Sequence, residues 1–436
     1  MDKKNIASKI TKNFSSLIIA QIIYKIITFF MMILMARFLG VEGFGQFSYG
    51  LSFVWIFLFL SDFGLSELFV RDVAAKRNLL GQYINNIIPL KIFIAIAVYL
   101  TVVLSAWQFS FGTEKFWIIL ILGASVVMDS FMYFFRSNFR IKETMEYEAV
   151  LTVIEALLKL AIVLFAIRLG VNLSGAILMS LALLSVSFIN SIINFGVFIS
   201  NYREIIFTFN KAFWFYLMRS AFPFALIYIL SFLNFRIDVI MLSLMKGDIA
   251  AGWYNACYKL LEQFLIVPLL LSYVYLPLFS RLSETVNNVH LIFKKTILPL
   301  FLVSLSIVIL CYFFGASLIR IIYGKAFEDA TDYIYPLSLV VIPFFIKPII
   351  EKVLYVAGRQ VIVFFIYFFG IISNVILNFL LIPRWGINGA SFATVFSEFL
   401  IVLSCLFYTN KKSFIMSNLA QRIPDVEIIA REELRT

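Results

Sequence analysis

The chain has 436 residues, of which 62% are hydrophobic and only 14% are charged, and phenylalanine alone occurs 50 times. Soluble domains contain roughly 45–50% apolar and about 25% charged residues, so this composition excludes a soluble fold and indicates an integral membrane protein. The formal net charge of +11 does not indicate nucleic-acid binding, because no water-facing domain carries a basic patch and membrane proteins concentrate lysine and arginine in cytoplasmic loops.

Twelve apolar segments are long enough to cross a bilayer, since a transmembrane helix needs about 20 mostly apolar residues. The first follows a charged N-terminus without a small-residue cleavage signal, so it is expected to be retained as a helix. The predicted spans are residues 14–35, 44–61, 84–106, 116–135, 149–167, 175–199, 220–244, 254–279, 296–318, 334–356, 361–382 and 389–409. The fold class expected is an all-α polytopic membrane protein.

The distribution of lysine and arginine predicts the orientation. With the N-terminus in the cytoplasm, the cytoplasmic segments hold 22 of these residues, Arg136 among them, and the opposite side holds 7. Because basic loops stay in the cytoplasm, this bias places both termini there. No loop is long enough for a folded domain, and residues 411–436 are expected to form a polar cytoplasmic tail.

Two short motifs occur at matching places in the two halves of the chain. GVEGFGQFSYG (40–50) follows the first span and GDIAAGWYNAC (247–257) follows the seventh, with glycines five apart in each and Ser48 matching Asn255. RLGVNLSGA (168–176) and RWGINGA (384–390) precede the last span of each half. The correspondence favours a duplicated unit of six helices, in residues 1–205 and 206–410, and transporters are often built from such repeats.

Three segments carry a family resemblance. ARFLGVEGFGQFSYG (36–50), SDFGLSELFVRDVA (61–74) and FRIDVIMLSLMKGDIAAGWYNACYKLLE (235–262) resemble the polysaccharide (O-antigen type) flippases of the multidrug/oligosaccharidyl-lipid/polysaccharide exporter superfamily, and the resemblance covers about residues 10–410. It implies two six-helix bundles related by a pseudo-two-fold repeat around a central cavity, and alternating access. It also implies the substrate, a polyprenyl-pyrophosphate-linked oligosaccharide that moves to the outer leaflet of a bacterial inner membrane for surface polysaccharide (lipopolysaccharide) biosynthesis. Other polysaccharide assembly proteins are expected partners.

Charged side chains inside the predicted spans are costly and by default face a cavity or a partner. In the first span, Gln21, Lys25 and Thr28 form one polar stripe, and Lys25 has no acid within a helical turn. Contact with an anionic substrate, an interhelical ion pair and snorkelling to the interface all remain open for Lys25. The candidates for lining a substrate cavity are Gln21, Lys25, Arg219, Asn234, Arg236, Lys259 and Lys347.

The acidic residues of the spans have two interpretations. Asp238, Glu262, Glu351 and Glu398 are candidates for binding a coupling proton or sodium ion. Helical spacing also allows three pairs to neutralise themselves within one helix, namely Glu155 with Lys159, Lys259 with Glu262, and Lys347 with Glu351. The segment of the last pair contains Pro336, Pro343 and Pro348, which predict a broken helix, and broken helices beside charges are common in moving elements.

Catalytic and metal-binding motifs are missing from the sequence. The only histidine, His290, has no acidic or cysteine cluster around it, and the three cysteines imply neither a metal site nor a disulfide framework. No P-loop is present. We therefore expect no enzyme activity and no bound cofactor. The alternatives to a flippase are a cation-coupled multidrug exporter of the same superfamily and, less favoured, a polytopic membrane glycosyltransferase or polymerase.

Overall fold

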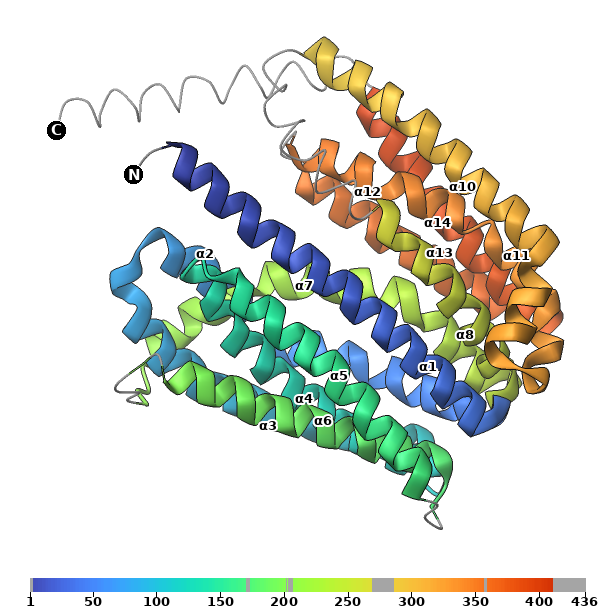
Figure 1. The fold of residues 1–436 in the computed structure, drawn as a ribbon, viewed down its shortest axis with the longest axis horizontal. Coiled ribbons are helices and arrows are strands. Elements are labelled where there is room, and N and C mark those ends of the chain that lie inside the picture. Colours follow the sequence, from blue (N-terminus) through green and yellow to red (C-terminus); the bar gives the residue numbers. More distant parts are fainter. Residues whose placement is uncertain are drawn as a thin grey trace. The chain divides into compact units, whose positions relative to one another are not determined.

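The computed structural model describes residues 3–169, 173–200, 202, 207–268, 286–356 and 359–410. Every regular element in these residues is helical (Figure 1), so the all-α polytopic fold is confirmed. The predicted tail, residues 411–436, lies outside the described residues, as does the second half of the predicted span 254–279.

The chain divides into two compact units, Met1–Asn255 and Ala256–Thr436. In the first unit, α1, α4, α5 and α6 pack on one another, and α7 packs against α1, α2 and α3. Its helices are α1 (Lys3–Asp62), α2 (Leu65–Ala75), the 3-10 turn η1 (Arg77–Leu79), α3 (Leu80–Ser110), α4 (Glu114–Ile141), α5 (Met145–Leu169), α6 (Gly175–Ile199), α7 (Lys211–Lys246) and the start of α8 (Asp248–Glu262).

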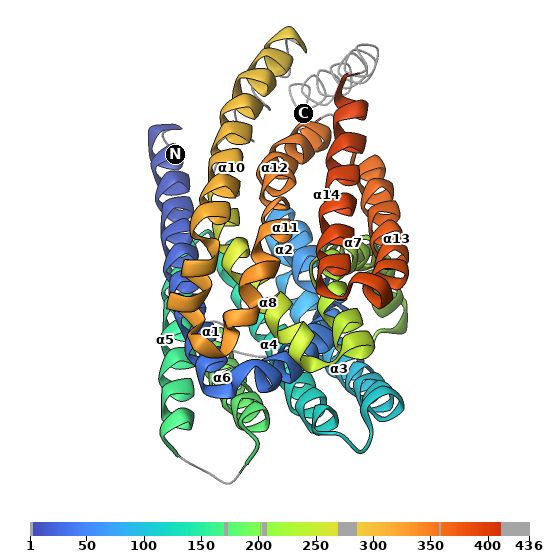
Figure 2. The same cartoon turned by 90° about the vertical axis from the view of Figure 1, so that its right-hand side faces the viewer.

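The second unit contains the end of α8 and the remaining helices. Its closest helix pair is α13 with α14, which lie side by side in Figure 2, and α12 packs against α10 and α14. The elements are η2 (Gln263–Leu265), α10 (Val286–Tyr323), η3 (Lys325–Tyr333), α11 (Ile334–Ser338), α12 (Val341–Val356), α13 (Gln360–Trp385) and α14 (Ile387–Asn410).

The long helix α1 holds two of the predicted spans. Its 60 residues are kinked at Gly40, whose φ of 67° is readily adopted only by a residue without a Cβ atom. A straight helix of that length would measure about 90 Å, three times the hydrocarbon thickness of a membrane. The kink therefore separates the predicted spans 14–35 and 44–61.

A buried lysine fixes the break between α1 and α2. The chain turns at Phe63 (φ 52°) and Gly64 (φ 75°), and Asp62 accepts hydrogen bonds from the Ser66 amide at 3.3 Å and the Ser66 hydroxyl at 2.5 Å. Lys91 of α3, which is completely buried, donates to Asp62 at 2.8 Å. An intramembrane base is thus satisfied by an acid at a helix end.

The apolar side chains explain why these helices belong in lipid. One core cluster of the first unit includes Met35, Phe47, Ile118 and Met179, all fully buried. Many equally large side chains point outward, such as Phe165 at 63% exposure and Phe379 at 68%. Such an apolar exterior is stable only in contact with lipid, so the chain is a multi-pass membrane protein.

The number of spans stays a prediction. Among the described residues, seven helices are long and apolar enough to cross a membrane, or eight if one bent pair is a single span. Two of the seven, Ser15–Ala74 and Val361–Thr409, are long enough to contain two predicted spans each. The bent pair joins Lys325–Ser338 to Val341–Glu351 at 44°, which confirms the broken helix predicted from the prolines.

The boundary between compact units differs in position from the predicted repeat boundary at residue 205. The packing boundary follows Asn255, because α7 is held against helices of the first half of the chain. A repeat is defined by correspondence along the sequence, so the division into 1–205 and 206–410 stays a prediction.

Candidate functional site

The centre of the first unit holds a buried ion pair between two helices. Arg136 of α4 and Glu155 of α5 are 4% and 3% exposed, and Arg136 Nη1 lies 2.7 Å from Glu155 Oε2. The rest of the guanidinium is also satisfied, since Nε donates to Asn194 Oδ1 at 3.0 Å and Nη2 donates to the Leu151 carbonyl at 3.2 Å. The pair therefore ties α4, α5 and α6 together.

A second cation shares the same carboxylate. Lys159 Nζ lies 2.6 Å from Glu155 Oε1 and donates to the Tyr24 hydroxyl of α1 at 2.7 Å. Tyr24 in turn donates to Glu155 Oε1 at 3.3 Å. Asp129 of α4 lies close enough to interact electrostatically with Lys159 and Arg136. Two bases and two acids thus meet among α1, α4 and α5.

This cluster corrects one part of the sequence analysis and confirms another. The Glu155–Lys159 pair within one helix is confirmed. The predicted end of the fourth span at residue 135 is too early for the helix, because α4 continues to Ile141 and the Arg136 side chain on this extension is buried. The available signal for Arg136 was Glu155, because a carboxylate inside a membrane span needs a cationic partner.

The polar stripe of α1 adjoins this cluster, because Lys25 directly follows Tyr24 in the chain. Gln21 is exposed and Lys25 is half-buried, while Thr28 donates to the Tyr24 carbonyl at 2.7 Å. Arg219, on the first half of α7, is exposed. Their assignment to a substrate cavity stays a prediction, and their exposure leaves room for it.

The charged residues at the end of α7 are buried. Arg236 is 9% exposed and Asp238 is 1% exposed, and the Tyr254 hydroxyl of α8 donates to Asp238 Oδ2 at 3.3 Å. The side chain of Asn234 lies outside the described residues. On α8, Lys259 pairs with Glu262 at 2.8 Å, as their spacing predicted.

The second unit has its own buried ion pair. Lys347 of α12 lies 2.8 Å from Glu398 of α14, at 5% and 1% exposure, and its Nζ lies 5.3 Å from the centres of the Phe344 and Tyr367 rings. The Tyr367 hydroxyl donates to Glu351. Helical spacing within α12 could not show the partner in α14.

Uncharged polar residues near this pair were missed from the sequence. Asn378 donates to Asn374 Oδ1 at 2.9 Å, and Asn374 donates to Ser397 Oγ at 3.3 Å. All three are buried. The four-residue spacing of the asparagines on an otherwise apolar helix was the available signal.

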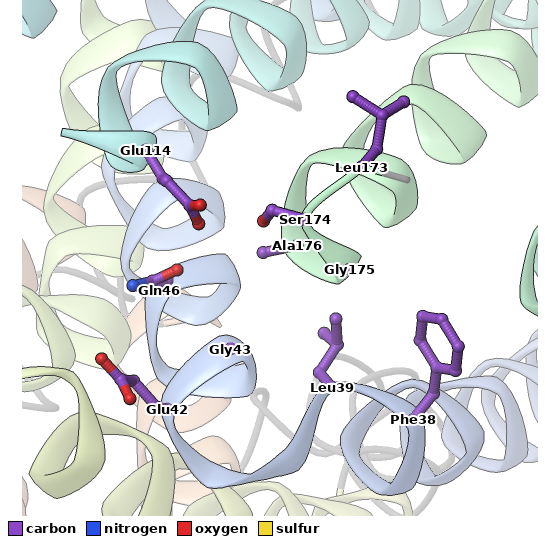
Figure 3. A pocket seen from close by; sticks show the side chains of 10 residues that line it. All are labelled: Phe38, Leu39, Glu42, Gly43, Gln46, Glu114, Leu173, Ser174, Gly175 and Ala176. Atoms are coloured by element: carbon purple, nitrogen blue, oxygen red, sulfur yellow. The ribbon is translucent and has the colours of Figure 1, made fainter. Parts of the chain in front are cut away.

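A cavity of about 510 Å³ opens beside the kink of α1, and the side chains of Glu114 and Ser174 point toward each other there (Figure 3). It is lined by Phe38, Leu39, Glu42, Gly43, Gln46, Glu114, Leu173, Ser174, Gly175 and Ala176. The described lining holds two acids and no base, so this cavity does not suit an anionic group.

Comparison with known proteins decides the family. The family model described as "Polysaccharide biosynthesis protein" matches residues 10–283. The chain belongs to this family. A second model, MatE, matches residues 223–380. The resemblance to polysaccharide flippases of the multidrug/oligosaccharidyl-lipid/polysaccharide exporter superfamily is thereby confirmed, and this family member is a membrane transporter.

One relative and two solved structures are similar to this polysaccharide biosynthesis protein over most of its length. The chain is 22% identical over 413 residues to the capsular polysaccharide biosynthesis protein CapF of Staphylococcus aureus, covering 92% of this chain and all of CapF. The fold is similar to that of the lipid II flippase MurJ in an inward closed conformation, with a TM-score of 0.73, 19% identity and coverage of 89% of this chain and 86% of MurJ. It is also similar to an inward-facing multidrug resistance MATE family transporter, with a TM-score of 0.70, 12% identity and coverage of 92% and 96%.

Proposed function

We propose that this protein is a flippase that moves a polyprenyl-pyrophosphate-linked oligosaccharide from the cytoplasmic to the outer leaflet of a bacterial inner membrane by alternating access. The observation that carries the proposal is the family match over residues 10–283, which covers the helices that hold most of the intramembrane bases. A pyrophosphate head and sugar hydroxyls cannot cross about 30 Å of hydrocarbon without groups that replace water.

The candidate residues supply such groups. Lys25 and Gln21 on α1 and Arg219 on α7 are half-buried or exposed, so they are available to phosphate and sugar oxygens. Arg236 and Lys347 are buried, and a substrate would meet them only after helices move. The polyprenyl tail stays in lipid throughout.

The ion gradient that would drive transport is part of the proposal. Glu262 and Glu398 pair with lysines, and Asp238 and Glu351 accept hydrogen bonds from tyrosines. Protonation or sodium binding at Asp238, Glu351 or Glu398 would weaken a contact between two helices, whereas the Glu262 pair lies within α8. Flipping rates under an imposed proton or sodium gradient, in wild type and in the Glu398→Gln variant, test this step.

A cation-coupled drug exporter is the second candidate function, favoured by the MatE match over residues 223–380. Such an exporter needs acids available to cationic drugs. Glu155, Glu262 and Glu398 are each in ion pairs, which disfavours their use by an exporter, whereas Glu42 and Glu114 line the cavity beside the kink of α1.

Reconstitution into liposomes distinguishes the flippase from the drug exporter. Proteoliposomes carrying a fluorescent lipid-pyrophosphate oligosaccharide are quenched from one side, and the protected fraction is measured over time. The flippase proposal expects the protected fraction to equilibrate only with protein present. Efflux of cationic dyes with no movement of the lipid would establish the exporter instead, and new glycosidic bonds would establish an enzyme.

The location and topology have their own test. We propose both termini in the cytoplasm of the inner membrane, from the 22-to-7 bias of basic residues. A reporter that is active only in the cytoplasm should be active when fused after Asn410. Activity of a reporter that works only in the periplasm, fused at the same position, would reverse the orientation.

A further inference from the structure

Tyr133 of α4 is an exposed aromatic residue with charged neighbours. It is 43% exposed, and it interacts electrostatically with Tyr24, Asp129 and Lys159. Aromatic residues that face lipid have apolar neighbours, because hydrocarbon excludes charged groups. The exposed surface of Tyr133 therefore lies beside the charge cluster of the first unit.

Contacts on both sides of Tyr133 fix its place on α4. Asp129, Tyr133 and Arg136 share one face of the helix, because they are four and three residues apart. Arg136 is held by Glu155 of α5, and Asp129 accepts a hydrogen bond from Ser187 of α6. Tyr133 lies between these two anchored residues, so its backbone is held in place while its own side chain stays accessible.

Tyr24 of α1 brings a second phenol to the same cluster. Its hydroxyl accepts a hydrogen bond from Lys159 at 2.7 Å and donates to Glu155 at 3.3 Å. Tyr24 is half-buried, and Gln21, one turn earlier on the same side of α1, is exposed. Because α1 packs against α4, an aromatic ring, a carboxylate, a phenol hydroxyl and an amide lie along two neighbouring helices.

The charges of this cluster suit a sugar better than a phosphate. Asp129 and Glu155 carry two negative charges, and Arg136 and Lys159 carry two positive charges. A pyrophosphate gains little attraction from groups whose charges cancel. Sugar hydroxyls both donate and accept hydrogen bonds, and carboxylate and phenol oxygens have lone pairs for them. A pyranose also has an apolar face of C–H groups, which packs on an aromatic ring such as that of Tyr133.

We propose that Tyr24, Asp129 and Tyr133 form an oligosaccharide subsite, in which the Tyr133 ring stacks on a pyranose whose hydroxyls donate to Asp129 and Tyr24. The inference rests on the proposed flippase function and divides the substrate between two sets of residues. The pyrophosphate interacts with the cations, among them Lys25, which directly follows Tyr24 in α1. The sugar at the subsite is therefore one attached close to the pyrophosphate.

Binding of two lipids to the full chain in detergent tests the proposal. One is a polyprenyl pyrophosphate that carries the oligosaccharide, and the other is the same polyprenyl pyrophosphate without sugars. Affinities come from the rise in unfolding temperature with lipid concentration, because a ligand that binds only the folded state stabilises it. The variants are Tyr133→Ala, Asp129→Asn and Lys25→Ala. The control is Tyr312→Ala on α10, which removes a 67%-exposed tyrosine of the second unit.

The proposal expects wild type to bind the oligosaccharide lipid at least tenfold more tightly than the sugar-free lipid. Tyr133→Ala and Asp129→Asn should lose this preference and keep the affinity for the sugar-free lipid within twofold, because only the sugar contacts these residues. Lys25→Ala should weaken the binding of both lipids by the same factor, and Tyr312→Ala should change neither.

Three results would overturn the subsite and leave the flippase intact. They are equal affinity of wild type for the two lipids, unchanged preference in Tyr133→Ala and Asp129→Asn, and equal losses for both lipids in these variants. A residue that only supports the fold would give the last result, because it does not distinguish the lipids. No binding of either lipid to wild type, together with no flipping in proteoliposomes, would instead refute the proposed function.

A conservative variant separates the ring of Tyr133 from its hydroxyl. Tyr133→Phe keeps the ring that stacks on the sugar, so its affinity for the oligosaccharide lipid should fall less than threefold. Flipping of this lipid in proteoliposomes should likewise stay well above that of Tyr133→Ala. A loss in Tyr133→Phe as large as that in Tyr133→Ala would overturn the stacking of a pyranose on the ring.

Discussion

Asn255 donates a hydrogen bond to Ser48 at 2.7 Å, although 207 positions separate them in the chain. The two residues hold the same place in the two matching motifs. Three positions earlier, a Cβ atom on Gly45 would stand 1.8 Å from the carbonyl oxygen of Asp248, and one on Gly252 would stand 2.3 Å from that of Val41. A duplicated unit brings equivalent residues together only near its symmetry axis. The contact therefore supports the duplication that the sequence predicted.

The Arg136–Glu155 pair predicts an asymmetry in stability. Arg136→Met leaves a buried carboxylate with one cation fewer, and breaking such a pair costs about 3–5 kcal/mol. Arg320→Met removes a side chain that pairs with Glu328 where both side chains are 56% exposed, so its cost should be under about 1 kcal/mol. Thermal unfolding in detergent measures both. Similar shifts for the two variants would show that the buried cluster does not stabilise the fold.

The cationic residues predict loss of transport without loss of protein. Lys25→Ala and Arg236→Ala should each abolish or sharply reduce surface glycan, because phosphate oxygens would lose a charged donor. Arg320→Ala is the control, since that residue pairs with Glu328 with both side chains 56% exposed. Glycan is measured by gel after complementation of a deletion strain, with membrane insertion checked by immunoblot. Wild-type glycan in both cavity variants would contradict the cationic cavity.

The Lys347–Glu398 pair predicts non-additive costs. Each single change, Lys347→Met or Glu398→Gln, leaves a buried partner uncompensated and should cost about 3–5 kcal/mol. The double variant removes the uncompensated charge, so it should recover most of that stability while transport remains impaired if the pair serves coupling. Unfolding of all four chains gives the interaction energy. Simple additivity would mean that the two charges do not interact.

Helix packing in the second unit predicts an overpacking effect. A Cβ atom on Gly370 of α13 would stand 2.6 Å from two side-chain carbons of Ile401 on α14. Gly370→Ala should therefore destabilise the protein by about 1–3 kcal/mol, while Gly196→Ala, which meets nothing, should not. Adding Ile401→Ala provides room for the methyl group and should recover part of the loss. If Ile401→Ala recovers none of the stability, the contact with Ile401 is not the cause of the loss.

Composition and apolar run length predicted most of the fold, since the bilayer imposes helices of known length. Ten of the twelve predicted spans lie within a described helix, or within one half of the kinked α1, and the broken segment at residues 334–356 was visible in its prolines. Boundaries were less accurate. Helix α4 extends six residues past the predicted end, and that extension carries Arg136 into the core.

The candidate site was predicted only in part. Pairs within one helix, such as Lys259 with Glu262, follow from spacing. Pairs between helices, such as Lys347 with Glu398 or Arg136 with Glu155, depend on which helix faces touch, and a single sequence does not contain that information. The contact of Gly45 and Gly252 with the opposite motif was predicted in part. Both motifs were evident in the sequence, but the sequence did not show that they touch.

The close contact between residues 40–48 and 247–255 also limits how the gene can evolve. After duplication, two halves of a chain are free to accumulate different residues, yet at Gly45 and Gly252 neither half can gain even a methyl group unless the other retreats. Substitutions at these positions and at Val41 and Asp248 should arise in matched sets across the halves. The predicted duplication therefore implies that this contact is kept as a shared constraint on both copies.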